Sequence, residues 1–310
     1  MFFSVIIPLY NKAEYIESAL RSVLDQRHQA FEVIVVDDGS TDDGARRVAA
    51  IGDSRLRLLH QRNSGVSVAR NRGVREATGD HIAFLDADDF WTPTYLSAIS
   101  KMVVQFPDCG LYATHFYRFN DSGSMQVPKL WRIRAGTAPQ RIKRCFFEMW
   151  SHAILFYTSS VVIQARILRE SGISFPEGEQ LAEDHDVWFR IAERWPLAYF
   201  PEPLVGCRVG VSDSLSTKLC SVEILPLTHR LISRYRSQTL PSSERRGVAR
   251  IIGIHRINAA RNLLLKGERR RAIEHLRDPF CLRAPRYWLR VLSAACFPAS
   301  LRARLLKYPE

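Results

Sequence analysis

The sequence predicts an α/β fold in which a Rossmann-like, mostly parallel sheet is flanked by helices and followed by an α-helical C-terminal region. Short apolar runs alternate with segments of helical periodicity over the first half of the chain. Several of these runs end in polar residues, which is typical of the ligand-binding edge of a parallel sheet. From about residue 221 the apolar residues recur only at helical spacing. We therefore predict two domains, residues 1–220 and residues 221–310.

The expected elements follow from periodicity and from turn residues. Strands are expected at residues 3–8, 31–36, 56–60, 82–85, 111–119 and 157–163. Helices are expected at residues 11–27, 44–51, 66–77, 94–106, 165–171 and 183–194, and in the C-terminal region at 221–237, 242–265 and 267–277. Gly267 indicates an αα-hairpin between the last two. Residues 120–150 are irregular, polar and then basic and aromatic, and a loop of this kind is usually functional.

Size and composition are those of a globular chain with a real core. The chain has 310 residues, of which 46% are hydrophobic. No apolar run is long enough to span a membrane, and the apolar start of the chain is expected to be a first strand rather than a signal peptide. The six cysteines are scattered without a CxxC pair. They indicate free thiols in a reducing compartment, so we expect a cytoplasmic location.

The positive charge is concentrated in the C-terminal region. Residues 221–310 contain 19 Lys and Arg and 6 Asp and Glu, whereas the other 220 residues contain 25 and 26. The whole net charge of +12 therefore comes from the last ninety residues. This asymmetry, together with interspersed leucines and aromatic residues, indicates helices that lie on an anionic membrane surface. The alternative is that these helices pack on the core and their arginines only extend to solvent.

Three carboxylates follow the apolar run at residues 82–85. Asp86 and Asp88, with one residue between them, can point to the same side and share a divalent cation through oxygen ligands. Charge at the carboxyl end of a buried strand lies where open α/β sheets bind ligands. The alternative is a solvated acidic turn in which Asp89 caps the next helix.

Polar residues also follow the first two strands. Asp37 and Asp38 precede Gly39, and such carboxylates can accept hydrogen bonds from a ribose hydroxyl or a base N–H. The alternative is that they only cap the following helix. Arg70 and Asn71 lie on the helix before the acidic strand, where they can reach a diphosphate or brace the carboxylates. The alternative is that Arg70 is an ordinary surface residue.

A second acidic pair, Glu183 and Asp184, opens a predicted helix. Acids in the first turn of a helix are favoured by its dipole, which explains them without chemistry. The functional interpretation is that one carboxylate acts as a general base. His185 is expected to be exposed rather than catalytic, because Trp188 and Phe189 occupy the buried face of this helix.

Taken together, these motifs resemble a known family. SVIIPLYNK, VVDDGSTDD, NSGVSVARNRG, TGDHIAFLDADD and AEDHDVWFR occur with the order and spacing of the inverting family 2 glycosyltransferases of the GT-A fold, over about residues 1–216. The resemblance implies transfer of a sugar from a nucleotide-diphosphate donor, foremost a UDP-sugar, to an acceptor hydroxyl, with inversion and with Mn²⁺ or Mg²⁺ as cofactor. A diphosphate leaving group accumulates charge, which a metal held by carboxylates stabilises.

The resemblance also implies site residues. Asp184 would be the catalytic base, and one base suffices for direct displacement with inversion. Asp88 and Asp86 would hold the metal, with Glu183 and Trp188 on the acceptor side. The residues implied for nucleotide-sugar binding are Pro8, Tyr10, Glu14, Asp37, Asp38, Arg70, Asn71 and Asp86. Many relatives carry a His shortly after the Arg that corresponds to Arg208, whereas this chain has Gly210 there. His115, His152 and the serines of residues 212–216 are candidate replacements.

The C-terminal region is similar to the Arg-rich helical tails of bacterial enzymes that build cell-surface polysaccharides. This implies a lipid-linked glycan acceptor and a peripheral position on the cytoplasmic face of the inner membrane, with no nucleic-acid partner. Two other functions remain open. A nucleotidyltransferase that makes nucleotide sugars should have a Gly-rich phosphate loop after the first strand, and residues 8–11 contain none. A non-catalytic membrane- or nucleic-acid-binding protein does not need Asp86, Asp88 and Asp184 together.

Overall fold

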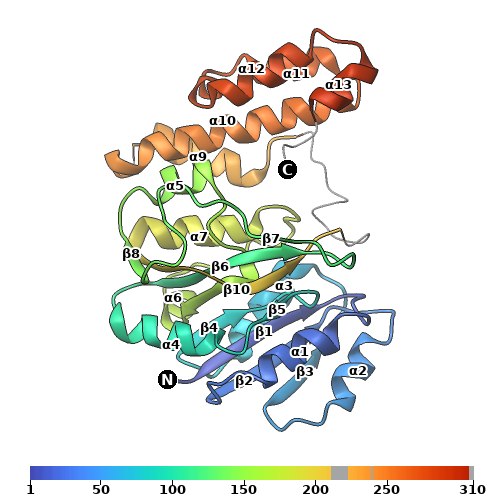
Figure 1. Cartoon of the computed structure of the whole chain (residues 1–310), viewed down its shortest axis with the longest axis vertical. Helices are drawn as coiled ribbons and strands as arrows, with labels where there is room; N and C mark the ends of the chain where they lie inside the picture. Colours follow the sequence, from blue (N-terminus) through green and yellow to red (C-terminus); the bar gives the residue numbers. More distant parts are fainter. Residues whose placement is uncertain (211–222, 239, 307–310) are drawn as a thin grey trace. The chain divides into compact units, whose positions relative to one another are not determined.

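A mixed sheet forms the centre of the N-terminal part of the computed structural model, which describes residues 1–210, 223–238 and 240–306 (Figure 1). Within the described residues the strand order is β3-β2-β1-β4-β9-β6-β10-β5, with β7 paired to β6 and β8 to β10. The strands are β1 (Phe3–Leu9), β2 (Phe31–Asp37), β3 (Leu56–His60), β4 (His81–Phe84), β5 (Phe90–Trp91), β6 (Leu111–Phe119), β7 (Met125–Gln126), β8 (Gln140–Ile142), β9 (Val161–Gln164) and β10 (Leu197–Arg208).

The predicted parallel sheet is confirmed in its first four strands. β1 pairs in parallel with β2 and with β4, and β2 pairs in parallel with β3, so that Ile6 lies between Ile34 and Phe84. β9 then runs antiparallel to both β4 and β6, and the second half of the sheet is mixed. The carboxyl ends of β2, β1 and β4 therefore lie next to one another, as the sequence predicts.

Helices cover both faces of the parallel half. Val5 and Ile7 of β1 belong to the same apolar core as Ile16 and Leu20 of α1 (Ile16–Leu24). Ile6 points to the opposite face, against α3 (Val66–Glu76), where a Cβ on Gly73 would lie 2.5 Å from the Cγ2 of Ile6. Burial on both faces explains why β1, β2 and β4 are almost continuously apolar, whereas the edge strand β3 is only half-buried. The other helices of this part are α2 (Gly44–Ala50), α4 (Tyr95–Gln105), α6 (Ala165–Glu170) and α7 (Glu183–Arg194).

Besides the short strands β5, β7 and β8, which were not predicted, two longer strands differ from the sequence prediction. β10 was not predicted, because Pro201 and Pro203 interrupt its apolar pattern. The structure accommodates both prolines at irregularities in the register between β10 and β6, after Phe200 and after Pro203. The strand predicted at 157–163 begins later, because a short 3₁₀ helix, η1 (Thr158–Ser160), precedes β9.

The chain forms two compact units, Met1–Lys143 with Ile154–Ser212, and Arg144–Ala153 with Asp213–Glu310. Residues 144–153 thus belong to the second unit, although they precede residue 220 in the sequence. Their helix, α5 (Phe146–His152), packs on α10 (Ser242–Leu265), where a Cβ on Gly247 would lie 2.2 Å from the backbone N of Glu148. The carboxylate of Glu244 accepts a hydrogen bond of 3.1 Å from the backbone N–H of Phe147.

The second unit is helical, as predicted. Besides α5 and α10 it contains α9 (Pro226–Arg236), α11 (Arg269–Leu276), η2 (Pro279–Arg283), α12 (Pro285–Ala294) and α13 (Ala299–Leu305). Its core includes Leu263, Leu276 and Val291, which are contributed by three different helices. Gly267, with φ of +86°, links α10 to α11 and confirms the predicted hairpin. Among the described residues, no helix has the length and apolar character needed to cross a membrane.

Candidate active site

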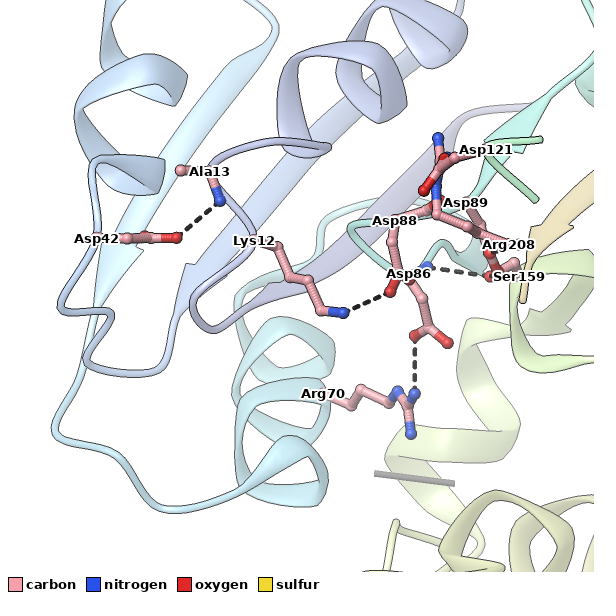
Figure 2. Close-up of polar contacts among 10 residues, drawn as sticks. All are labelled: Lys12, Ala13, Asp42, Arg70, Asp86, Asp88, Asp89, Asp121, Ser159 and Arg208. Carbon is pink, nitrogen blue, oxygen red and sulfur yellow. Dashed lines mark hydrogen bonds and ion pairs between the residues drawn. The ribbon is translucent and has the colours of Figure 1, made fainter. Parts of the chain in front are cut away.

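The site lies at the shared edge formed by the carboxyl ends of β1, β2 and β4. The segments that follow these strands bring Lys12, Asp86 and Asp88 together, with Arg70 approaching from α3 (Figure 2). The predicted convergence of strand ends is therefore found in the structure. Because these strands are parallel and adjacent, residues that are far apart in the sequence meet here.

Arg70 links the two acidic motifs. Its side chain is 5% exposed and donates hydrogen bonds to Oδ1 of Asp86 at 2.8 Å and to Oε1 of Glu183 at 3.0 Å. Burial by itself lowers the pKa of the guanidinium, but the charges of Asp86, Glu183 and Asp184 outweigh it and raise this pKa above its ordinary value. Arg70 is thus a fixed buried cation that braces the carboxylates, and not a surface residue.

Asp88 is paired with a lysine that the sequence prediction did not include. Nζ of Lys12 lies 2.7 Å from Oδ2 of Asp88, and the two side chains are 16% and 19% exposed. Arg208 donates from Nε to the backbone oxygen of Asp88 at 3.2 Å and lies between the rings of Tyr15 and Phe119, each 4.6 Å from its guanidinium carbon. Lys12 is the last residue of the motif SVIIPLYNK and lies three residues after the end of β1. Its position at this edge of the sheet was the sequence feature that could have indicated a role in the site.

Asp89 is not the helix cap that the alternative interpretation required. Its carboxylate is buried, accepting hydrogen bonds from Oγ of Ser159 at 2.5 Å and from the backbone N–H of Arg208 at 2.8 Å. Burial, together with the nearby charges of Asp86 and Asp88, raises its pKa well above the ordinary value. Asp89 therefore fixes the acidic turn to two neighbouring segments from inside the protein.

The η1 turn connects the acidic motifs a second time. Oγ of Ser159 accepts a hydrogen bond of 3.0 Å from the backbone N–H of Asp86, and Oγ1 of Thr158 donates one of 2.7 Å to Oδ2 of Asp184. Neither residue could be predicted to lie at the site, because the sequence of this segment predicts a strand, in which neighbouring side chains alternate between two faces. In the 3₁₀ turn, successive side chains reach the two motifs from one short segment.

The adjacent carboxylates Glu183 and Asp184 have opposite pKa shifts. Burial and the charge of Asp184 raise the pKa of Glu183, and Arg70 offsets this only in part. Burial also raises the pKa of Asp184, but the charge of His185, the charge of Arg70 and the hydrogen bond from Thr158 together bring it below the ordinary 3.8. The lowered pKa keeps the carboxylate of Asp184 ionised at neutral pH, so that it can accept a proton.

Asp37 and Asp38 are buried and bound to their own surroundings. Asp38 accepts hydrogen bonds of 2.8 Å from the backbone N–H groups of Ser64 and Gly65 and from the side chain of Gln61. Asp37 accepts one of 3.0 Å from the backbone N–H of Ser40 and contacts Nδ1 of His60 at 3.0 Å. Both carboxylates thus shape the polar segments at this edge of the sheet, in particular the loop of residues 61–65.

Two predicted contacts need correction. Asn71 does not face the donor side, because its side chain bonds the backbone N and O of Phe175 and the carboxylate of Glu177. Trp188 does not face an acceptor directly, because it is fully buried against Phe84 and Phe175, with ring centroids 6.3 and 5.9 Å away. Large aromatic residues of amphipathic helices are usually core residues. Trp188 positions α7 by packing its buried face on the core of the protein.

The segment after β1 is open to solvent. Pro8 is half-buried within β1, Tyr10 is 47% exposed, and Glu14 is exposed. Asn11, at the start of the helix expected at residues 11–27, lies before α1, which begins at Ile16. It has φ of +48° and accepts a 2.8 Å hydrogen bond from the backbone N–H of Thr41, which ties this segment to the one after β2.

The described residues supply no replacement for the histidine expected near Gly210. They contain no group of three or more His, Cys, Asp or Glu side chains placed to hold a metal. His115 is buried, with its ring nitrogens facing the carbonyl oxygens of Pro128 and Leu155. His152 belongs to the second unit. The candidate serines at 212–216 lie outside the described residues.

Comparison with known proteins decides the family. The model of the family described as glycosyl transferase family 2 matches residues 4–162, a little over half of the chain. The chain belongs to glycosyl transferase family 2. This confirms the resemblance seen in the sequence motifs. Asp86 and Asp88, which form the D-x-D motif of this family 2 chain, both lie within the matched region.

The curated relatives agree. This family 2 chain is 29% identical over 236 residues to an uncharacterised glycosyltransferase of Rickettsia conorii, which covers 74% of this chain and 37% of the relative. It is 30% identical over 205 residues to the glycosyltransferase EpsJ of Bacillus subtilis, covering 62% and 57%. The chain spans only about a third of the length of the first relatives it matches.

The structural comparison shows the GT-A fold. The crystal structure of Staphylococcus aureus TarS, residues 1–349, in complex with UDP-GlcNAc matches with a TM-score of 0.64 and 18% identity, over 89% of each chain. The predicted fold class, a GT-A sheet with helices on both faces and a helical C-terminal region, is therefore confirmed for this family 2 chain.

Proposed function

We propose that this chain catalyses inverting transfer of a sugar from a nucleotide-diphosphate donor to an acceptor hydroxyl. The observation that supports this most is Arg70, which joins Asp86 of the D-x-D motif to Glu183, the neighbour of Asp184. The buried guanidinium of Arg70 thus holds Asp86, on the proposed diphosphate side, close to the acidic pair that contains the candidate base Asp184. The complex of TarS with UDP-GlcNAc supports a UDP-sugar as the donor class.

Asp184 is the proposed base. Its carboxylate is charged at neutral pH, and Thr158 fixes one of its oxygens. As the acceptor oxygen forms its bond to the anomeric carbon, the bond from that carbon to the diphosphate breaks and the hydroxyl proton moves to Asp184. One displacement inverts the configuration and requires no nucleophilic carboxylate. The diphosphate leaves with the electron pair of the broken bond.

The donor set at Asp86 and Asp88 fits Mn²⁺ or Mg²⁺. Each carboxylate has one oxygen that accepts no hydrogen bond from the described residues, and hard divalent cations prefer such oxygens. Mg²⁺ is usually held by one or two carboxylates and by substrate phosphates, so two aspartates suffice without the missing histidine. A bound cation would supply Lewis-acid stabilisation of charge on the diphosphate.

The proposed acceptor is a lipid-linked glycan in cell-surface polysaccharide synthesis. The Arg-rich helices of residues 221–310 support this, since an enzyme with a lipid-linked acceptor works at a membrane surface. We accordingly propose a peripheral location on the cytoplasmic face of the inner membrane. Transfer of radiolabelled sugar from UDP-sugars into the lipid fraction of a membrane extract tests this acceptor class against soluble glycans.

We expect Asp88→Ala to abolish Mn²⁺-dependent reaction of the donor. Hydrolysis or transfer of a panel of nucleotide sugars should fall by about a hundredfold or more, because a metal on the diphosphate contributes several kcal/mol. Asp43→Ala, at an exposed surface ion pair with Arg46, is the matched control and should be unaffected. Equal Mn²⁺-dependent rates in the two variants would refute the metal assignment. Absence of any reaction with nucleotide sugars in the wild type, in spite of a thermal shift with nucleotide diphosphates, would favour a binding function.

We expect Lys12→Met to tighten metal binding. The ammonium of Lys12 neutralises Asp88, so that a divalent cation must compete with it for the same carboxylate. Removing a partly buried pair of this kind should lower the Kd for Mn²⁺ by about fivefold, measured by titration calorimetry without donor. Lys101→Met, an exposed lysine on α4, is the control. An unchanged or higher Kd in Lys12→Met would show that Lys12 and the metal do not share Asp88.

A further inference from the structure

Exposed apolar side chains are concentrated in the last part of the second unit. Of the thirteen large apolar side chains that are exposed among the described residues, six lie between residues 265 and 305. They are Leu265, Leu282, Leu289, Phe297, Leu301 and Leu305, with Leu282 and Leu289 at 58% and 56% exposure. Single exposed leucines are ordinary, but such a concentration in one segment indicates an interaction surface.

The same segment is strongly basic. Residues 266–306 contain ten Lys and Arg against three Asp and Glu, a net charge of +7. Two of the three acids are within 3 Å of an arginine, Glu268 with Arg271 and Asp278 with Arg256. Arg269, Arg277, Arg283 and Arg286 have no ion-pair partner among the residues that the structure describes, and all four are exposed. Their charge is therefore available to a partner.

Apolar and basic side chains share the outer face of α12. Val291 and Ala294 point into the core of the unit, whereas Arg286, Leu289 and Ser293 recur at helical spacing on the exposed side. Leu282 precedes this face and Phe297 follows it. The result is one helix face, which we call the α12 face, with leucine and arginine side by side.

Hydrogen bonds bring the α13 leucines to this region. Nε of Arg290, next to Leu289, donates to the backbone oxygen of Leu305 at 2.9 Å. Nη1 of Arg302, next to Leu301, donates to the backbone oxygen of Leu264 at 3.0 Å. The ends of α10 and α13 and the middle of α12 are thus connected within the second unit, where α11, α12 and α13 pack beside α10 (Figure 1).

We propose that the α12 face, with the adjoining leucines of α13 and the end of α10, docks on an anionic lipid bilayer. Leucines inserted at the headgroup level and arginines on anionic headgroups are the two contributions that bind interfacial helices. A second copy of the chain is disfavoured as the partner, because it would bring the same net positive charge to the interface. A nucleic acid is disfavoured because its phosphates would leave the exposed leucines without apolar partners. The proposal specifies the surface through which the peripheral location proposed above would be reached, and vesicle binding tests it independently of sugar transfer.

The test is sedimentation of full-length protein with vesicles of phosphatidylcholine alone or mixed with phosphatidylglycerol, at low and at high salt. Wild type should bind the mixed vesicles, and salt should weaken the binding. Arg283→Gln with Arg286→Gln should lower the partition coefficient by roughly thirtyfold, since each basic residue near such a surface contributes about 1 kcal/mol. Leu282→Ser with Leu289→Ser should lower it by about tenfold or more.

Matched controls are Arg27→Gln with Arg75→Gln, and Val104→Ser, all at exposed positions of the first unit. They should bind vesicles as wild type does. Circular dichroism melting of every variant checks folding, and the substituted side chains are exposed enough that each should melt as wild type. Equal binding to neutral and anionic vesicles, unchanged binding of both α12 double variants, or leucine variants that change only the oligomeric state or nucleic-acid binding would each overturn the proposal.

Discussion

Replacing Asp184 by Asn should lower the rate of sugar transfer by about 10²–10⁴-fold and leave the chain folded, because a positioned general base contributes about this much. Asparagine keeps the size and can still exchange a hydrogen bond with Thr158, which donates to Asp184 at 2.7 Å in the wild type. It cannot take up the proton of the acceptor hydroxyl. The rate should be measured at saturating donor, so that a change in kcat is separated from a change in donor binding.

Asp186→Asn is the matched control for Asp184→Asn. It makes the same substitution on the same helix, where the carboxylate of Asp186 is buried and pairs with Nε of Arg190 at 2.8 Å. It should affect stability more than kcat. If the two variants lost kcat equally, Asp184 would have no special role as a base, and the proposed mechanism would fail.

The pH dependence of kcat/KM provides a second test of the role of Asp184. The pKa of Asp184 lies below 3.8, so its carboxylate is charged at pH 7 and is neutralised only as the pH falls through that low value. The kcat/KM of the wild type should therefore show no acid limb from this base above about pH 4. The pKa of Glu183 is raised above 4.5, so a limb seen at higher pH would belong to Glu183 and should disappear in Glu183→Gln.

Replacing Arg70 by Met should destabilise the chain by about 3–5 kcal/mol, because it leaves the buried carboxylate of Glu183 and the partly exposed carboxylate of Asp86 without their cation. Methionine is an apolar side chain of similar length, but it lacks the guanidinium, whose carbon lies 5.4 Å from the ring centroid of Phe175 in the wild type, so the loss is mainly electrostatic. Asp86 and Glu183 would then face each other across the vacated position with no compensating charge. Urea unfolding at pH 7, followed by tryptophan fluorescence, measures the loss.

The control for Arg70→Met is Arg75→Met, at an exposed position of the same helix, which should change stability by no more than about 0.5 kcal/mol. Adding Glu183→Gln to Arg70→Met should recover about 1–3 kcal/mol, since one of the two orphaned charges is removed. The alternative outcome is that Glu183→Gln lowers the free energy of unfolding by the same amount in the Arg70→Met background as in the wild type. The two residues would then not be coupled, and the link between the acidic motifs would be refuted.

The sequence predicted those parts of the site that local chemistry marks. Asp86 and Asp88 could be singled out because a buried apolar run ends abruptly in acids, whereas Asp184 was singled out from its neighbour Glu183 only through the resemblance to family 2 glycosyltransferases. The pairing of Lys12 with Asp88 could not be predicted, since the two residues lie 76 positions apart and meet only when β1 and β4 pair. Thr158 and Ser159 were not predicted as site residues, because the neighbouring apolar residues gave their turn the sequence pattern of a strand.

Asn71 and Trp188 were expected at the site. Each lies next to a site residue or one turn from it, but its side chain points elsewhere. Asn71 immediately follows Arg70, yet on a helix neighbouring side chains point about 100° apart, and Asn71 binds Phe175 instead. Trp188 lies one turn after Asp184, and its apolar ring is better placed against Phe84 than in solvent. Burial on one face of an element selects among such neighbours, and only the packed structure shows which face is buried.

By itself, the sequence determined the α/β class, the parallel strands β1 to β4, the family and the concentration of positive charge near the C-terminus. These follow from periodicity, composition and local motifs, which require no knowledge of distant contacts. Only the tertiary structure decided that Arg70 joins the acidic motifs, that residues 144–153 belong with the C-terminal helices, and that leucines share the outer face of α12 with arginines. Each of these depends on side chains that are far apart in the sequence and that packing brings together. The local sequence does not indicate which distant residues come into contact.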